Sequence, residues 1–544
     1  MRQKSIVAAA IGDCVHVAGV LSFLRIAEHY GYRTHFLGAA VDVDRLEREI
    51  ERLRPDMVAL SYRLTPETLV PLLARVRAMV EAHHWQDKVW LFGGTPPAAE
   101  VARQSGLFTV TFGDATRPQV EAFFARRATE AQPSGPPPQT LMARITAAAP
   151  LPLLRHHFGL PSLEATVAGA RQLALSGAID VLSIGPDQNA QACFFRPQEM
   201  RPELDGAGGV PLRSPADLRA IYEATRCGNF PLVRCYSGTR DLVRWAEMLA
   251  ETINVAWGAV PLFWYNVLDG RSNRLLPDAI HENQQAMRWY ASRGIPLEVN
   301  EAHHWSLREA PDTVAVAAAF LAAYNAKRMG ARHYVAQFMF NTPARTSAPM
   351  DLAKMQAKVA LIESLHDDGF VSVRQTRTGL ASMSAAADVA KGQLAASTFY
   401  QLALEPHIVH VVAYCEGDHA ATPAEIIESA GIVRGVIQNR TLGPLPMTEH
   451  PLIRARTEEL VDEARLLLEA VRALPAQHVD DPWTDPDTLA RAVQMGLLDA
   501  PHLCGNPHAS GKVATQMKNG ACVAVDPKTG EVLKEKERLA LLRS

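Results

Sequence analysis

The chain has 544 residues, of which 48% are hydrophobic and 21% are charged, and this composition excludes wholesale disorder. At roughly 150 residues per domain, the length predicts two to four domains. The 55 basic and 58 acidic residues give a net charge of −3, which offers no electrostatic case for binding nucleic acid.

Residues 1–128 alternate short β-branched runs with amphipathic helical stretches. The apolar N-terminal stretch stops at Asp13 without a cleavage-type ending, so it predicts the first strand of a cytoplasmic protein rather than a secretion signal. The alternation predicts a doubly wound, flavodoxin-like parallel sheet, in which ligands bind beyond the carboxyl ends of the strands. The expected strands are Ile6–Ile11, Thr34–Leu37, Met57–Ser61, Lys88–Phe92 and Phe108–Phe112.

The rest of the chain predicts a second α/β domain. Residues 129–149 form an expected linker, because this segment begins with a run rich in proline, glycine and polar residues. Residues 150–475 predict a (β/α)8 barrel with one strand not placed, and residues 476–544 predict a tail packed on the barrel. The expected barrel strands are Val181–Ile184, Leu232–Tyr236, Asn254–Trp257, Leu297–Asn300, Tyr334–Phe338, Val371–Gln375 and Ile408–Val412.

Neither a membrane span nor a cysteine framework is predicted. The longest apolar run, Val314 to Tyr324, is far shorter than the roughly 20 residues that a membrane-spanning helix needs, and it predicts a buried helix. The seven cysteines are an odd number without a CxxC pair. This spacing argues against both a disulfide framework and a structural zinc site.

The loop after the first expected strand contains the sequence GDCVHVAG and leads directly into a helix. On residue type alone, His16 in this loop could simply cap the helix or pack within the loop. Small or hydroxylated residues, however, end the neighbouring strands, namely Ser61, the pair Gly93 and Gly94, and Gly113. Such residues at successive strand ends predict a deep slot in which a long flat substituent can lie.

These motifs resemble the cobalamin-binding domain of the B12-dependent mutases and methionine synthase, with its DxHxxG motif, its serine-bearing SxL and its GG pair. The resemblance implies that His16 is the lower cobalt ligand and that Gly19 admits the nucleotide tail of the cofactor. It also implies that Ser61 bonds the benzimidazole and that Gly93 and Gly94 line its channel. The other residues expected to bind the cofactor are Asp13, Thr65, Gly113 and Thr116.

Two residues depart from the family pattern. Cys14 stands where the family has the aspartate two residues before the histidine, and Arg63 replaces the leucine of SxL. A ligating histidine normally has its other nitrogen held by a carboxylate. If Asp13 does not reach His16, cobalt ligation is weakened, and a base-on or five-coordinate cofactor is the alternative.

Several segments of the expected barrel resemble the large (epsilon) subunit of glutamate mutase, also called methylaspartate mutase, which forms a barrel over adenosylcobalamin. In that enzyme the two domains are separate chains, whereas here they would be fused. The matching segments are Leu232–Arg234, Glu298–Glu301, Ile408–Val411 followed by Glu416, Ala492–Asp499 and Ser510–Lys512.

The resemblance assigns catalytic roles to three barrel residues. Arg234 would clamp a substrate carboxylate, Glu301 would accept the substrate ammonium or a proton, and Glu416 would bond the ribose of the adenosyl group. The structural alternative is a salt bridge between Arg234 and Glu301 at the barrel mouth.

Departures in the barrel bear on the substrate. Glutamate mutase uses three arginines on its two substrate carboxylates, and the alignment retains only one of them, with Gln191 and His281 near the positions of the others. A related acid or amino acid with a single carboxylate is therefore expected, read by Asn189, Gln191 and His281 in addition to Arg234 and Glu301.

The resemblance thus predicts an adenosylcobalamin-dependent carbon-skeleton mutase, that is, a radical isomerase with a cobalt-containing cofactor. The alternatives are a corrinoid methyltransferase, a cobalamin sensor or carrier, and a mutase-like paralogue without activity. Against the first, there is no room before residue 5 for the helical cap of methionine synthase-like proteins; against the second, no output module is found. We expect a small acid as substrate and neither nucleic acid nor membrane as partner, and leave a homodimer open.

Overall fold

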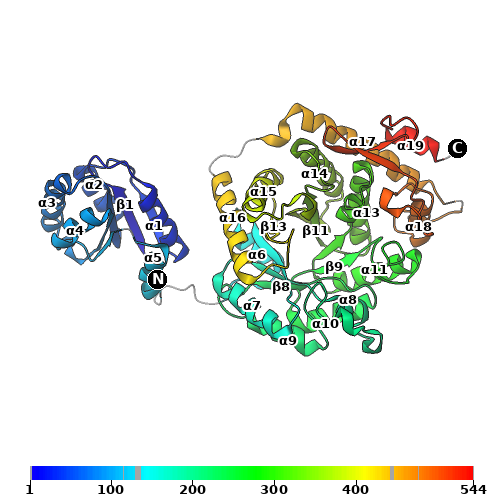
Figure 1. Ribbon diagram of the computed structural model, residues 1–544, viewed down its shortest axis with the longest axis horizontal. Coiled ribbons are helices and arrows are strands. Elements are labelled where there is room, and N and C mark those ends of the chain that lie inside the picture. The colour runs from blue at the N-terminus through cyan, green and yellow to red at the C-terminus, as the bar shows by residue number, and fades with distance from the viewer. Residues whose placement is uncertain (1–2, 114, 129–135, 442–445, 476, 543–544) are drawn as a thin grey trace. The chain divides into compact units, whose positions relative to one another are not determined.

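The computed structural model describes residues 3–113, 115–128, 136–441, 446–475 and 477–542. The chain divides into two compact units, Met1–Gly135 and Pro136–Ser544, and each is described by itself (Figure 1). Most of the expected linker, from residue 136 onward, belongs to the second unit, and residues 129–135 lie outside the described residues.

The N-terminal unit is a five-stranded parallel sheet in the order β2-β1-β3-β4-β5, which confirms the doubly wound fold. Helices α1 and α5 cover one face and α2, α3 and α4 cover the other. Because both faces are covered, central strands such as β1 are buried along their whole length. The bounds are β1 (Ser5–Ala10), α1 (Ala18–His29), β2 (Arg33–Phe36), α2 (Val43–Leu53), β3 (Met57–Tyr62), α3 (Pro66–Ala82), β4 (Val89–Gly94), α4 (Pro96–Gln104), β5 (Val110–Gly113) and α5 (Arg117–Ala128).

The second unit is built on an eight-stranded parallel sheet in the order β8-β7-β6-β13-β12-β11-β10-β9, curled into a nearly closed barrel. Figure 1 shows helices arranged around this sheet. The predicted barrel is therefore confirmed. Its strands are β6 (Leu153–Phe158), β7 (Val181–Ile184), β8 (Leu232–Cys235), β9 (Gly258–Pro261), β10 (Leu297–Asn300), β11 (His333–Phe340), β12 (Val371–Thr378) and β13 (Ile408–His410).

Two details of the barrel correct the sequence analysis. The strand that was not placed is β6, whose sequence LLRHHF hides its pattern because Arg155, His156 and His157 are polar. The strand expected at Asn254–Trp257 is wrong, because β9 begins at Gly258, just after the expected strand ends. Trp257 instead belongs to an apolar layer that closes the bottom of the barrel together with Leu141 of α6.

The barrel helices and the tail complete the second unit. The apolar run Val314–Tyr324 lies in α13 and is almost wholly buried, as expected. The tail contains α18, an antiparallel β14–β15 hairpin and α19, and α18 and α19 pack on α11 and α17. No described helix is long and apolar enough to cross a membrane. The bounds are α6 (Leu141–Ala148), α7 (Leu163–Ser176), α8 (Gln188–Cys193), α9 (Pro215–Ala224), α10 (Leu242–Ile253), α11 (Leu276–Ser292), α12 (Ala302–Ser306), α13 (Asp312–Arg328), α14 (Ala348–Glu363), α15 (Ala387–Gln401), α16 (Pro423–Thr441), α17 (Pro451–Arg472), α18 (Pro486–Gln494), β14 (Ala514–Lys518), β15 (Ala521–Val525) and α19 (Glu535–Leu541).

Candidate functional site

A narrow cavity of about 150 Å³ lies at the carboxyl ends of β3 and β4 in the N-terminal unit, beside α1. This is the edge of a doubly wound sheet at which ligands bind. Its wall is mainly apolar. Four of the residues predicted from the sequence line it, namely Gly19, Ser61, Gly93 and Gly94.

The cavity can admit a flat group because glycines leave open the space that larger side chains would fill. A Cβ atom added at Gly19 or Gly93 would meet nothing within 4 Å, so any larger residue there would project into open space. Gly94 has a different role, since a Cβ there would lie 2.4 Å from the carbonyl oxygen of Tyr62 and would force β3 and β4 apart. Ser61 is buried and offers a hydroxyl to the cavity wall.

His16 lies in the loop between β1 and α1 and is exposed. Its Nδ1 is 3.9 Å from the Sγ of buried Cys14, which also accepts a hydrogen bond from the backbone N–H of Arg63. Within the described part of the chain, no carboxylate bonds the imidazole, and Asp13 is exposed. The nitrogen that a carboxylate would normally hold thus faces a thiol, while Nε2 is free to bind a ligand.

The remaining residues predicted to bind the cofactor lie outside the cavity wall. Thr65 is at the N-cap position of α3, where its hydroxyl is 3.0 Å from that of Thr68. Thr116 bonds Gln119 at the start of α5. Gly113 ends β5 and packs against α4, because a Cβ there would lie 3.0 Å from that of Ala99.

The family comparison agrees with this geometry. Residues 4–123 match the family model described as the B12 binding domain. Because this match spans the N-terminal unit, we refer to that unit as the B12-binding domain. Cobalamin is therefore the cofactor indicated for this chain, and the match covers the sheet, the cavity and the His16 loop together.

Other comparisons add little. No curated protein matches the chain. A novel cobalamin-binding protein from Desulfitobacterium hafniense DCB-2 is 22% identical, with a TM-score of 0.21, over 23% of this chain and 60% of that one. The cobalamin-dependent S-adenosylmethionine radical enzyme OxsB is 10% identical, with a TM-score of 0.18, over 80% of this chain and 56% of that one. These TM-scores are too low to inform function.

The barrel has its own cavity, of about 680 Å³. In contrast to the slot of the B12-binding domain, its wall carries many charged and polar side chains. Neutral amides, tyrosines and histidines line it together with five arginines and two carboxylates: Arg155, Arg201, Arg234, Arg271, Arg377, Asp269 and Glu298. The excess of guanidinium groups favours an anionic ligand.

Arg234, predicted from the sequence to bind substrate, lines this cavity and is fully buried. Its Nη1 is 3.8 Å from Glu298, which also accepts a bond of 3.2 Å from Arg155 and one of 2.8 Å from the indole of Trp257. Burial alone would raise the pKa of Glu298, but Arg234 and Arg155 lower it to about 2. The alternative pairing of Arg234 with Glu301 is wrong, because Glu298 is the partner.

Several buried arginine donors have no partner among the residues that the structure describes. Nε and Nη2 of Arg234 and Nε of Arg155 make no hydrogen bond with any described residue. A buried polar group left unpaired costs about 1–3 kcal/mol, and more where it is charged. Arg377, on β12, also lines the cavity, and its one hydrogen bond to a described residue is to the backbone carbonyl of Thr378, at 3.4 Å. These guanidinium groups are open to a bound anion.

Histidines form much of the remaining polar wall. His157, His303 and His304 line the cavity, and His410 lies 4.3 Å from His157, measured between ring centroids. Burial lowers the pKa of His303 to about 3 and the pKa values of the other three well below their usual range. The rings are therefore neutral at physiological pH and can donate or accept hydrogen bonds without adding charge.

Glu301, predicted to accept the substrate ammonium or a proton, is not among the residues that line the cavity. Its carboxylate is buried away from the cavity wall and accepts bonds from the backbone N–H groups of Leu262 and Phe263 and from the indole of Trp305, at 3.2, 3.1 and 2.8 Å. Burial raises the pKa of Glu301 to about 8 against the effect of these donors. Glu301 thus joins the loop after β9 to α12, and the carboxylate of the same segment that lines the cavity is that of Glu298.

Glu416, predicted to bond the adenosyl ribose, follows β13 and pairs with His156 at 3.0 Å. It also accepts a bond of 2.8 Å from the backbone N–H of Ala413. Burial would raise the pKa of Glu416, but the hydrogen bond and charge of His156 lower it. Glu416 lies at the carboxyl end of the barrel strands, although it is not in the wall of the central cavity.

Of Asn189, Gln191 and His281, which were also expected to contact substrate, Gln191 alone is among the described residues that line the cavity. Asn189 is buried and is fully used by bonds to Arg201 and Asp205. His281 is exposed on α11, the outer helix that follows β9, where it contacts Gln285. The loose alignment that placed His281 in the site is therefore wrong.

Proposed function

We propose that this chain is an adenosylcobalamin-dependent carbon-skeleton mutase, a radical isomerase that acts on a small carboxylic or amino acid. Two features support this proposal. One is the B12-binding domain. The other is a barrel whose cavity at the carboxyl ends of the strands is large enough for a small substrate and has a cationic wall.

The observation that carries the proposal is the set of unpaired donors on fully buried Arg234. A planar guanidinium with two free N–H groups matches a carboxylate in a bidentate arrangement. Ser183 and Glu298 hold only its Nη1 side, at 3.2 and 3.8 Å. A substrate carboxylate bound by Arg234 would therefore complete a site that the protein leaves incomplete.

The arginines also bear on the class of substrate. The alignment suggested that one arginine remained, but Arg155, Arg234 and Arg377 come from three different strands and line one cavity. The reason for expecting a single carboxylate is therefore removed. A small acid with one or two carboxylates, or the corresponding amino acid, fits this wall, with Gln191 and the neutral histidines bonding its other polar groups.

In the B12-binding domain, His16 would be the lower ligand to cobalt, and Gly19, Ser61, Gly93 and Gly94 would hold the nucleotide tail of the cofactor. When bound, adenosylcobalamin supplies radical chemistry at an unactivated carbon. The barrel residues would then hold the substrate by its anionic groups and keep water from the reacting carbon.

The decisive experiment is electron paramagnetic resonance of the full chain mixed with adenosylcobalamin and candidate small acids. A coupled signal of cob(II)alamin and an organic radical, seen with any of these acids, would support the mutase. Methyl transfer to or from cobalt, without a radical and without need for the adenosyl group, would instead establish the methyltransferase. Cobalamin binding with neither activity across a broad set of acids would favour a carrier or an inactive paralogue.

A further inference from the structure

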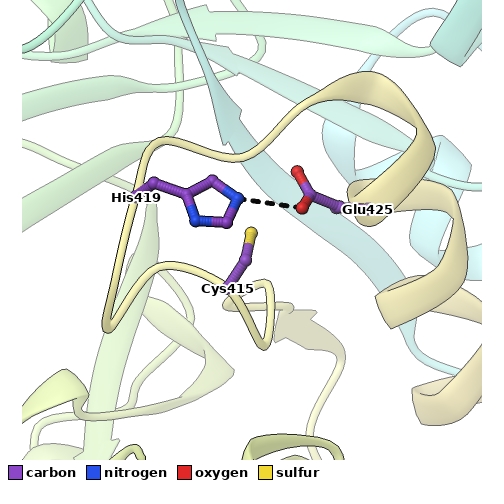
Figure 2. A group of neighbouring side chains, drawn as sticks. All are labelled: Cys415, His419 and Glu425. Carbon is purple, nitrogen blue, oxygen red and sulfur yellow. Dashed lines mark hydrogen bonds and ion pairs between the residues drawn. The ribbon is translucent and has the colours of Figure 1, made fainter. Parts of the chain in front are cut away.

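Three side chains with metal-binding atoms meet in the loop after β13, outside both cavities (Figure 2). Cys415 and His419 belong to this loop, and Glu425 lies in the first turn of α16. One potential ligand atom from each residue lies within 4.8 Å of the other two. Within the part of the chain that the structure describes, this is the one group of histidine, cysteine and acidic residues that could hold a metal ion.

The imidazole of His419 is already oriented as a metal ligand would be. Its Nδ1 is 2.9 Å from a carboxylate oxygen of Asp418, and its Nε2 points toward the cluster, 2.9 Å from Oε1 of Glu425. A carboxylate on the second nitrogen fixes the tautomer and raises the basicity of the first. This is the arrangement that His16 lacks, where the second nitrogen faces the thiol of Cys14.

The other two ligands are held by the backbone around them. The Oε2 of Glu425 accepts bonds of 2.9 and 2.7 Å from the backbone N–H and the hydroxyl of Thr422, which leaves Oε1 directed at the cluster. The carbonyl of Cys415 accepts backbone bonds from Asp418 and His419, at 2.8 and 2.9 Å. The loop is thus a tight turn that fixes the spacing between the thiol and the imidazole.

We propose that Cys415, His419 and Glu425 bind one Zn²⁺ ion, with a solvent molecule completing a four-coordinate site. One sulfur, one nitrogen and one oxygen ligand suit Zn²⁺ better than the oxygen-seeking Mg²⁺ or Ca²⁺. Binding replaces the thiol proton, which is released to solvent as the Zn–S bond forms. The absence of a CxxC pair does not argue against this site, because the site uses a single cysteine.

The position of the site gives the ion a structural task. Glu416 follows Cys415 directly, and its carboxylate pairs with His156 of β6. An ion bound to Cys415 and Glu425 would tie this loop to α16 and so fix Glu416 at the active face of the barrel. The zinc site stands on its own geometry and does not depend on the proposed mutase activity.

The competing explanation is that His419 is a protonated imidazolium held between Asp418 and Glu425, with no metal involved. Both explanations use the same contacts, but only the metal site needs the sulfur of Cys415. The test therefore depends on the thiol.

The experiment measures Zn²⁺ binding to the full chain, prepared without cobalamin and stripped with a chelator, by competition with a chromophoric zinc chelator. We expect one Zn²⁺ per chain, a loss of affinity of about 100-fold or more in Cys415→Ser and in His419→Ala, and a loss of about 10- to 100-fold in Asp418→Asn. Cadmium should give a thiolate charge-transfer absorbance that Cys415→Ser abolishes.

Two matched variants control for nonspecific binding. His478→Ala removes an exposed histidine that contacts a carboxylate, at 3.2 Å from Asp480, but that belongs to no cysteine-containing cluster of described residues. Cys504→Ser removes an exposed cysteine. Both should bind Zn²⁺ like the parent chain. His419 is exposed, so its alanine variant should fold even if Cys415→Ser does not. Absence of stoichiometric zinc in the parent chain, or unchanged affinity in His419→Ala, would overturn the proposal.

Discussion

The two cavities of this chain are built in opposite ways. The slot of the B12-binding domain is defined by missing side chains, with glycine and serine at the ends of β3 and β4, whereas the barrel cavity is defined by charged side chains from many strands. The first can recognise a ligand by shape and the second by charge. A site made of small residues therefore follows from short local motifs, whereas a site made of arginines depends on how distant strands are brought together.

The largest expected effect is in the charge-based cavity. Arg234→Lys should lower turnover by about 10- to 1000-fold, because charge-assisted bonds contribute about 1.5–3 kcal/mol each and about 1.4 kcal/mol corresponds to a tenfold change in rate. Steady-state kinetics with the accepted acid measures this effect. Cobalamin affinity should stay unchanged. A parallel loss of cobalamin binding would contradict the proposal that Arg234 binds the substrate and not the cofactor.

The shape-based slot should respond to a filled space instead. Gly93→Val places a side chain where the structure is open, so cobalamin affinity should fall by about 10- to 100-fold at the usual overpacking cost of about 1–3 kcal/mol. The matched control is Gly392→Val on α15 of the barrel, where an added Cβ also meets nothing within 4 Å. Spectroscopic titration measures the cobalamin affinity of both variants. Equal losses of affinity in the two would mean that the slot is not the binding site.

His16 gives a test with a smaller effect on affinity but a clear spectroscopic signature. His16→Ala should remove a nitrogen ligand, change the visible spectrum of bound cobalamin and weaken binding by about tenfold. An unchanged spectrum would mean a base-on cofactor or another ligand.

A second substitution, expected to strengthen cobalamin binding, tests the same role of His16. Cys14→Asp places a carboxylate beside the Nδ1 of His16, at the position now occupied by the thiol. It should strengthen cobalt ligation, because such a partner raises the basicity of the imidazole. The affinities of the parent chain and the variant for cobalamin provide the measurement, and weaker binding by a folded variant would count against ligation by His16.

The last prediction concerns Glu301 and the stability of the protein, not its turnover. Its pKa is about 8 in the folded protein and 4.5 in the unfolded chain, so its contribution to stability is present at low pH and is lost as the pH rises from 4.5 to 8. At about 1.4 kcal/mol per unit, the loss is on the order of a few kcal/mol. Glu301→Gln should flatten this slope in urea melts at pH 5 and pH 8. A variant that keeps the slope but loses turnover would return Glu301 to the substrate site.

Sequence motifs predicted the N-terminal sheet and four of the residues in its slot, because each motif lies at the end of one strand. They did not exclude Thr65 and Thr116, since a residue in the right loop can turn toward its own helix. The structure shows these two bonded to Thr68 and Gln119 instead.

In the barrel, the fold was predictable but the wall was not. Arg155 and Arg377 were missed, although a local signal was present. Leu153 and Leu232 both belong to the apolar layer at the bottom of the barrel. Arg155 and Arg234 each stand two residues after one of these leucines. Alternation along a strand places both arginines in the barrel interior. Glu301 was chosen over Glu298 because alignment to a family motif gives a segment and not the direction of each side chain.

Trp257 gives the barrel cavity a further property. Its ring centroid is 5.4 and 5.3 Å from the guanidinium carbons of Arg155 and Arg234, and its indole bonds Glu298. An anion that binds these arginines changes the electric field at the indole. The cofactor-free protein therefore carries a fluorescent reporter of anion binding at the base of its cavity. The difference in fluorescence between the parent chain and Trp257→Phe would isolate that signal from the other seven of the eight tryptophans.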